Sequence, residues 1–149
     1  MAHKFIEHLI EDHEKQRKLG KQLREAKTPE ERKRLLDEFR KELLPHMEGE
    51  EASIFDFMKA EGGEPKKGAM EAIQEHHVAK LVLRELEDLS LDGDTFRAKA
   101  YVLDELNEHH MQEEEKEHFP QVERMTSPQQ LSELYQQYEE KEKAVKSQL

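Results

Sequence analysis

Apolar residues recur along most of the chain at intervals of three and four, the spacing that places them on one face of an α-helix. The pattern runs through residues 3–26, 29–59, 68–89 and 95–118, and a weaker one follows in residues 128–144. No segment alternates apolar and polar residues as a half-buried strand does. The sequence therefore predicts an all-α protein, an antiparallel four-helix bundle with a short C-terminal helix.

Cap and turn signals separate the predicted helices. They lie at Thr28-Pro29, at residues 61–65 and at residues 91–94. Thr28 is a typical N-cap and Pro29 a typical first helical residue, while glycines end the second and third helices. Pro45 falls inside the second helix, where we expect a kink. Pro120 is expected to close the fourth helix.

Length and charge narrow the class of protein. The chain has 149 residues, which predicts a single domain over residues 1–149. Charged residues make up 40% and apolar residues 34%, with a net charge of −11. Because nucleic acids and anionic membranes attract basic surfaces, the acidic balance argues against both as partners. No protein partner is indicated.

The chain contains no cysteine, which excludes disulfides, thiolate metal sites and cysteine nucleophiles. No stretch approaches the ~20 apolar residues of a membrane span, and the first residues lack the apolar core of a signal peptide. A cytoplasmic protein is therefore expected.

Two helix pairs repeat the same polar residues. The motif H-M-x-x-E-E-x-x-x-F occurs at residues 46–55 and again at 110–119. The helix before each copy carries an acid followed by histidine, Asp12-His13 in one case and Glu75-His76 in the other, with a cation four residues on. The chain is thus a two-fold internal repeat of a helix pair.

The repeated residues have the chemistry of metal ligands. Histidine and glutamate four residues apart lie on one helix face, about 5–6 Å apart at Cβ. Imidazole with carboxylate suits iron, zinc or manganese, and one carboxylate can bridge two cations. The six candidates are His13, His46, Glu50, His76, His110 and Glu114.

A single histidine on an apolar face is usually a structural core residue, and a single H-x-x-x-E is common on solvated helices. Six such residues on four helices are harder to explain as structural or solvated. Burying two ionised glutamates without a cation would cost roughly several kcal/mol for each glutamate. A metal-free helical interaction module is the alternative, and it predicts that these residues are solvated.

The order of these motifs over residues 6–145 resembles the hemerythrin-like HHE cation-binding family. The resemblance implies an up-down-up-down bundle around a non-haem di-iron centre. It further implies that His13 and His46 serve one metal, that His76 and His110 serve the other, and that Glu50 and Glu114 bridge the two.

One position departs from the oxygen-carrying members of that family. They have a further histidine one turn before the third-helix ligand, where this chain has Ala72. The chain is therefore more similar to the branch with two histidines per metal, seen in iron-sensing and iron-cluster-repair members, although it lacks the cysteine-bearing N-terminal segment of the latter.

The resemblance implies a protein that binds or senses a small ligand such as dioxygen or nitric oxide, with an oxo or hydroxo bridge at the metals, or one that handles iron. A di-iron redox enzyme acting on peroxide or nitric oxide is the alternative. The sequence identifies no catalytic residue. Zinc or manganese could replace iron at the same ligands.

The other histidines have less specific interpretations. His3 and His8 lie off the His13 face and are expected to be solvated, and His118 is expected at the exposed end of its helix. His77 is the alternative to His76 as a ligand, and the repeat favours His76. The tyrosines Tyr101, Tyr135 and Tyr138 are either close to the site or simply packed. Leu103, Leu106, His110 and Glu114 are expected to share one helix face.

Overall fold

The computed structural model of the chain describes residues 2–149 and is helical throughout, with no strand in that range. The all-α class is therefore confirmed. The elements are α1 (Lys4–Glu25), α2 (Pro29–Ala52), α3 (Ile54–Glu61), α4 (Gly63–Glu87), α5 (Asp94–Glu113), the π-helical turn η1 (Glu114–His118), α6 (Phe119–Met125) and α7 (Pro128–Lys146). None of these helices is both long and apolar enough to cross a bilayer.

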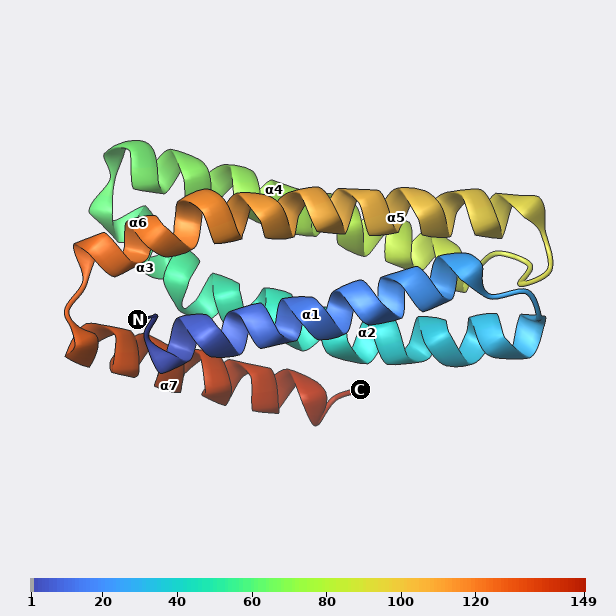
Figure 1. Cartoon of the computed structure of the whole chain (residues 1–149), viewed down its shortest axis with the longest axis horizontal. Helices are drawn as coiled ribbons and strands as arrows, with labels where there is room; N and C mark the ends of the chain where they lie inside the picture. Colours follow the sequence, from blue (N-terminus) through green and yellow to red (C-terminus); the bar gives the residue numbers. More distant parts are fainter. Residues whose placement is uncertain (1) are drawn as a thin grey trace.

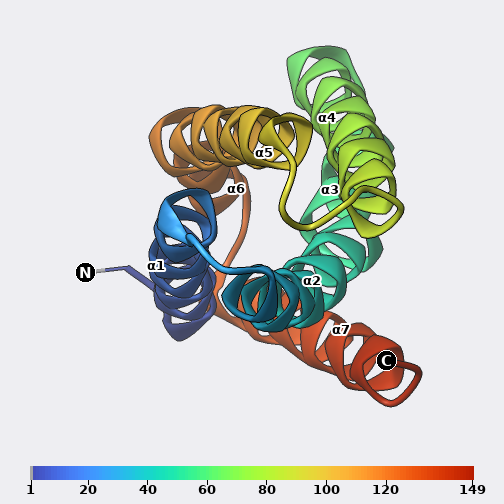
Figure 2. The same cartoon turned by 90° about the vertical axis from the view of Figure 1, so that its right-hand side faces the viewer.

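The four long helices α1, α2, α4 and α5 lie side by side along the length of the molecule, and consecutive ones are connected at alternate ends (Figure 1). Helices α3 and α6 continue α2 and α5 at one end. Seen end-on, α7 lies outside the four long helices, next to α2 (Figure 2). The prediction of one domain over residues 1–149 stays a prediction.

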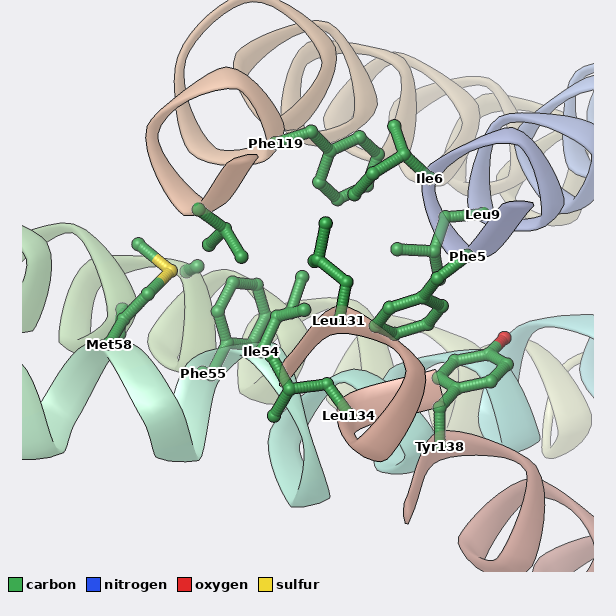
Figure 3. Close-up of a cluster of buried hydrophobic side chains, with 13 residues drawn as sticks. Phe5, Ile6, Leu9, Ile54, Phe55, Met58, Phe119, Leu131, Leu134 and Tyr138 are labelled. Carbon is green, nitrogen blue, oxygen red and sulfur yellow. The ribbon is translucent and has the colours of Figure 1, made fainter. Parts of the chain in front are cut away.

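The apolar core consists of two clusters that lie toward opposite ends of the bundle. One is built around Phe5, Ile54, Phe55 and Phe119, with α7 contributing Leu131, Leu134 and Tyr138 (Figure 3). The other is built around Leu35, Phe39, Leu43, Leu83, Leu86, Phe96 and Leu103. Each large side chain buried in this way stabilises the fold by roughly 1.5–3 kcal/mol. In α1 and α4 the candidate histidine lies between residues of the two clusters, while in α2 His46 and Glu50 lie on either side of Met47 of the second cluster.

The second helix is interrupted at Ser53 rather than continuing to residue 59 as predicted. Helix α2 runs through Pro45 and ends at Ala52, and Ser53 has a non-helical backbone with φ −125° and ψ −91°. Its hydroxyl donates to the carbonyl oxygen of Gly49 at 2.7 Å. A serine whose hydroxyl bonds the carbonyl four residues back competes with the hydrogen bonds of the helix backbone. The break in the helix therefore lies at Ser53 and not at Pro45.

Two further helix boundaries differ from the prediction. Helix α4 begins at Gly63 and not at residue 68, because Gly62 and Gly63 adopt φ values of 73° and 58° and complete the turn themselves. Proline is tolerated in the first turn of a helix, so Pro65 does not delay it. The fourth helix does not close at Pro120 but continues through η1 into α6.

The π-helical turn η1 changes the direction in which the residues after Glu114 point. In an uninterrupted α-helix, Phe119 would lie about 180° around the axis from His110. The π-turn accommodates one extra residue, which rotates Phe119 by about 100° around the axis, back toward the face of His110. Phe119 is accordingly buried, at 1% exposed, and so is its repeat equivalent Phe55, which follows the break at Ser53. Both helix irregularities thus turn a phenylalanine into the core.

Candidate metal centre

The structure brings all six candidate residues together in the middle of the bundle. Helices α1, α2, α4 and α5 each contribute one histidine, while α2 and the start of η1 each contribute one glutamate. None of the six is more than 5% exposed: His13, His46, Glu50, His76, His110 and Glu114. The pairs His46–Glu50 and His110–Glu114 each point inward together because a spacing of four residues keeps them on one face.

The six residues form two overlapping groups of possible metal ligands. His13 and His46 make one group with both glutamates, while His76 and His110 make the other group with the same two glutamates. Within each group, one donor atom of every residue lies within 4.8 Å of the others. Glu50 and Glu114 therefore occupy the position from which a carboxylate can face two cations at once.

Each imidazole directs its Nε2 atom toward the glutamates. The Nε2 atoms of His13 and His110 lie 3.1 and 3.4 Å from Glu114 Oε1. Those of His46 and His76 both lie 3.2 Å from an oxygen of Glu50. These contacts close a compact inner shell in which donor atoms from four helices converge.

Despite these close contacts, the inner shell contains several buried polar atoms that lack a hydrogen bond of suitable geometry. They are both carboxylate oxygens of Glu50, both of Glu114, and the Nε2 atoms of His13 and His46. A buried donor or acceptor without a partner costs about 1–3 kcal/mol, and more when it is charged. Bound cations would accept these lone pairs and remove the cost. The residues present therefore fit a site for two metal ions.

Each histidine is held from behind by a carboxylate on another helix. His13 Nδ1 lies 2.7 Å from Glu115 Oε2, and His76 Nδ1 lies 2.8 Å from Glu51 Oε2. These two acids immediately follow the inner glutamates in the sequence, so adjacent glutamates contact the two ring nitrogens of the same histidine. A carboxylate on Nδ1 fixes the tautomer with the Nε2 lone pair directed inward, and it raises the basicity of the ligand.

The other two histidines have the same arrangement with acids from the first helix of each pair. His46 Nδ1 lies 3.1 Å from Asp12 Oδ2, and His110 Nδ1 lies 2.7 Å from Glu75 Oε1. Asp12 and Glu75 are repeat equivalents, as are His46 and His110. The two-fold repeat in the sequence is thus also a two-fold repeat of histidine–carboxylate contacts.

The cation four residues after each first-helix histidine binds one of these outer carboxylates. Arg17 donates to both oxygens of Glu115, at 3.0 and 3.1 Å, and Lys80 lies 3.7 Å from Glu51. Burial would raise the pKa of Glu115, but the hydrogen bonds from His13 and Arg17 outweigh it and lower the pKa to about 2. Glu115 is therefore ionised and accepts from the imidazole at any ordinary pH.

The two phenylalanines of the repeated motif cover two of the imidazoles. Phe119 stacks on His13 with ring centroids 5.5 Å apart, and Phe55 lies against His76 at the same distance. The apolar rings exclude water from the inner shell, which strengthens the electrostatic interactions inside it.

Without a metal, the charges of the inner shell stabilise one another. Burial opposes protonation of His46, but the negative charge of Glu50 outweighs it and raises the pKa well above the ordinary value of a histidine. Glu114 raises the pKa of His110 in the same way, and the pKa of His13 is also raised. Burial alone would raise the pKa of Glu50, yet the charge of His46 and close polar contacts with neighbouring side chains hold the pKa well below 4.5.

These shifts predict opposite pH dependences for the apo and metal-loaded forms. A histidine whose pKa is raised by folding stabilises the apo-protein fully below the unfolded value of about 6.5, and this contribution is lost as pH rises through the folded pKa. The melting temperature of the apo-protein should therefore rise as pH falls from 8 to 6. Metal binding requires neutral imidazole, so the loaded form should lose metal and stability as pH falls from about 6 toward 4.

The measurement is a pair of calorimetric pH series, one with iron and one with a chelator. The stability difference between the two forms should shrink by about 1.4 kcal/mol per pH unit for each proton that binding displaces. Two parallel series would contradict the linkage between these histidines and metal.

Four of the five remaining histidines are placed as follows. His77 is exposed, whereas His76 is 1% exposed and belongs to the inner shell. His3 is partly buried and caps α1, accepting from the backbone N–H of Phe5 at 3.0 Å. His8 is also partly buried, so neither is simply solvated. The expectation that His118 lies at an exposed helix end was wrong: it is 8% exposed, because η1 turns it toward Phe55.

Sequence reasoning did not identify the outer contacts of the site. The missed residues are Asp12, Glu51, Glu75 and Glu115, together with Tyr138 of α7. The acids carried a signal, since each lies next to a candidate ligand in both copies of the repeat. Tyr138 carried none, because α7 has no counterpart in the repeat.

The fold and the site define a class of protein, a helical bundle whose core holds a buried cluster of histidines and carboxylates suited to cations. The chain belongs to the hemerythrin HHE cation-binding domain family, whose family model matches residues 4–122. This confirms the resemblance seen in the motifs. Searches of curated proteins and of solved structures give no match.

Proposed function

We propose that this protein holds a non-haem di-iron centre and binds a small ligand there. The observation that carries the proposal is the set of unsatisfied oxygens on Glu50 and Glu114, which lie between two pairs of histidines. In this proposal His13 and His46 hold one iron, His76 and His110 hold the other, and the two glutamates bridge them. The scaffold is the up-down-up-down bundle of the four long helices.

A mixed imidazole and carboxylate set supports iron, and zinc or manganese would fit the same donors. When bound, a di-iron centre supplies redox-active Lewis acids with open coordination positions. The chain's own part is to keep the imidazoles neutral and oriented, through the carboxylates on their Nδ1 atoms, and to exclude water with Phe55 and Phe119.

A buried amide pair favours a small polar ligand over simple iron storage. Gln16 follows His13 by three residues and Asn107 precedes His110 by three, and both are at most 3% exposed. Asn107 Nδ2 donates to Gln16 Oε1 at 3.0 Å, which leaves Gln16 Nε2 buried without a partner. Residues three apart are neighbours on one helix face, so this free donor belongs to a residue adjacent to His13.

Ala72 adds room at the other side of the centre. It is buried one turn before His76 and has no donor atom, so the position leaves a coordination site for water or an external ligand. Reversible dioxygen carriage is accordingly a weaker proposal than binding or sensing. The metal-free alternative predicted solvated ligand residues, whereas all six are buried.

Elemental analysis of protein purified from iron-replete cells, with its absorption spectrum, tests the proposal. About two irons per chain are expected, because the six residues form two groups that share both glutamates, which suits a carboxylate-bridged pair. One equivalent or none after anaerobic iron loading would refute the two-metal centre. Zinc in place of iron would keep the architecture but remove the redox part of the proposal, and manganese would keep the architecture but replace the proposed metal. Addition of nitric oxide or azide, followed spectroscopically, then tests ligand binding.

A further inference from the structure

The two halves of the metal centre are related by the internal repeat, but their outer surroundings differ. Asp12, which holds His46, has a side chain only 3% exposed. Its equivalent Glu75, which holds His110, has a side chain 33% exposed. One histidine–carboxylate contact is therefore sealed from water, whereas the other is open to it.

Tyr138 of α7 is responsible for this difference. Its hydroxyl donates to Asp12 Oδ2 at 2.6 Å and lies 2.9 Å from His46 Nδ1. The tyrosine is 0% exposed, and burial together with the charge of Asp12 raises the pKa of its phenol well above 10. It remains a neutral donor that closes a triangle of hydrogen bonds behind one imidazole. In Figure 3 its ring lies at the edge of the apolar cluster with the hydroxyl directed out of it.

Helix α7 is built to hold Tyr138 in this position. Ser127 and Gln130 form a capping box that starts the helix, and Leu131 and Leu134 anchor it in the core. Gly49 of α2 leaves the space for the ring: a Cβ at that position would lie 2.6 Å from Tyr138 Cε2. The match to the family model ends at residue 122, before α7 begins. Tyr138 therefore lies outside the matched residues.

We propose that α7 is a clamp on one half of the centre, in which Tyr138 acts as a positioning residue that holds His46 through Asp12. The metal at His13 and His46 is thereby released more slowly than the metal at His76 and His110, where the outer carboxylate is open to water. Loss of a metal requires an imidazole to swing away, and the sealed triangle restrains His46 while nothing equivalent restrains His110. This inference rests on the proposed two-metal centre.

Release of ferrous iron from the full-length loaded protein to an excess of a coloured chelator, under anaerobic conditions, tests the clamp. The wild type should release iron in two phases of similar amplitude. Tyr138→Phe keeps the ring and removes the hydroxyl, so it should accelerate the slow phase about tenfold or more and leave the fast phase unchanged.

Two matched variants assign the phases. Tyr135→Phe changes a tyrosine on the same helix that stacks on Phe5 without bonding the site, and it should alter neither phase. Glu75→Gln removes the carboxylate behind His110 and should accelerate the fast phase alone. A purely structural role of the Tyr138 hydroxyl would instead loosen both metals together.

The outcomes separate the clamp from the proposed function. Two bound irons that leave in a single phase, or a Tyr138→Phe variant that accelerates both phases alike or neither, would overturn the clamp and leave the metal centre intact. Failure of the wild type to bind iron would overturn both.

Discussion

Glu50→Ala and Glu114→Ala are each expected to reduce the iron content from about two ions per chain to well below one. Both side chains are 0% exposed and face both pairs of histidines. A bridging carboxylate contributes to two metals at once, so its loss should weaken both positions. The repeat makes the two glutamates equivalent, and the two variants should therefore behave alike.

Companion variants separate the loss of charge from the loss of volume. Glu50→Gln and Glu114→Gln keep the size of the side chain, and they should also lose most of the iron because the bridging charge is gone. Glu117→Ala removes an exposed glutamate of η1 and should keep both ions. Circular dichroism of the apo-proteins checks that each variant is folded. If one variant lost a single ion while its counterpart lost both, the glutamates would not be equivalent bridges.

The glutamates that follow these two should have an intermediate effect. From the sequence alone, Glu51 and Glu115 point away from the inner face, which predicts small effects on metal content. The structure places them on the Nδ1 atoms of His76 and His13. Loss of such a partner usually lowers metal affinity by about 10–100-fold. Alanine at either position should therefore leave two ions bound at saturation but weaken their affinity in a titration.

The arrangement of the inner shell could be predicted because its information is local and repeated. A spacing of four residues is enough to place His46 beside Glu50 and His110 beside Glu114. The same periodicity selected the correct inner faces of α1 and α4, on which His13 and His76 lie. Whether these residues bind metal is still a prediction, and the buried unsatisfied oxygens are what now supports it.

The expectations that failed depended on small rotations around a helix axis. Leu106 was expected on the His110 face but is 40% exposed, whereas Asn107 is 3% exposed. Viewed down the axis of α5, Leu103 and Asn107 lie about 20° and 60° from His110 in one direction, and these positions are buried. Leu106 lies about 40° from His110 in the opposite direction, toward solvent. His118 was misplaced because a π-turn adds about 100° of rotation, and no periodicity rule anticipates such a turn.

The contribution of α7 could not be predicted because it is a contact between distant segments. Tyr138 reaches Asp12 and His46 only after the helix has docked outside the four long helices. The weaker apolar pattern over residues 128–144 indicated a packed edge, and its Leu131, Leu134 and Tyr138 are all buried. That edge shows that the helix docks, but it does not specify the residues on which it docks.

His76→Ala is expected to remove the second metal, whereas His77→Ala should leave nearly all of it. The two residues are neighbours in the chain and differ by about 100° around the helix axis. His76 directs Nε2 at Glu50 at 3.2 Å and Nδ1 at Glu51 at 2.8 Å, while His77 is exposed. Iron should fall to about one ion per chain in the first variant, and the apo-protein should also lose a few kcal/mol of stability, of the order found for large buried side chains cut to alanine.

The alanine variant could lose metal simply because it is less stable. His76→Gln therefore serves as the second variant. Glutamine restores much of the lost volume and can still donate to Glu51, but it is a poor ligand for iron, so stability should recover while the second ion stays absent. Retention of both ions in His76→Ala, with loss in His77→Ala, would show that the true inner face of α4 is the one that carries His77. The buried positions of Ala72, Ala79 and Leu83, which share the His76 face, would then have no common explanation.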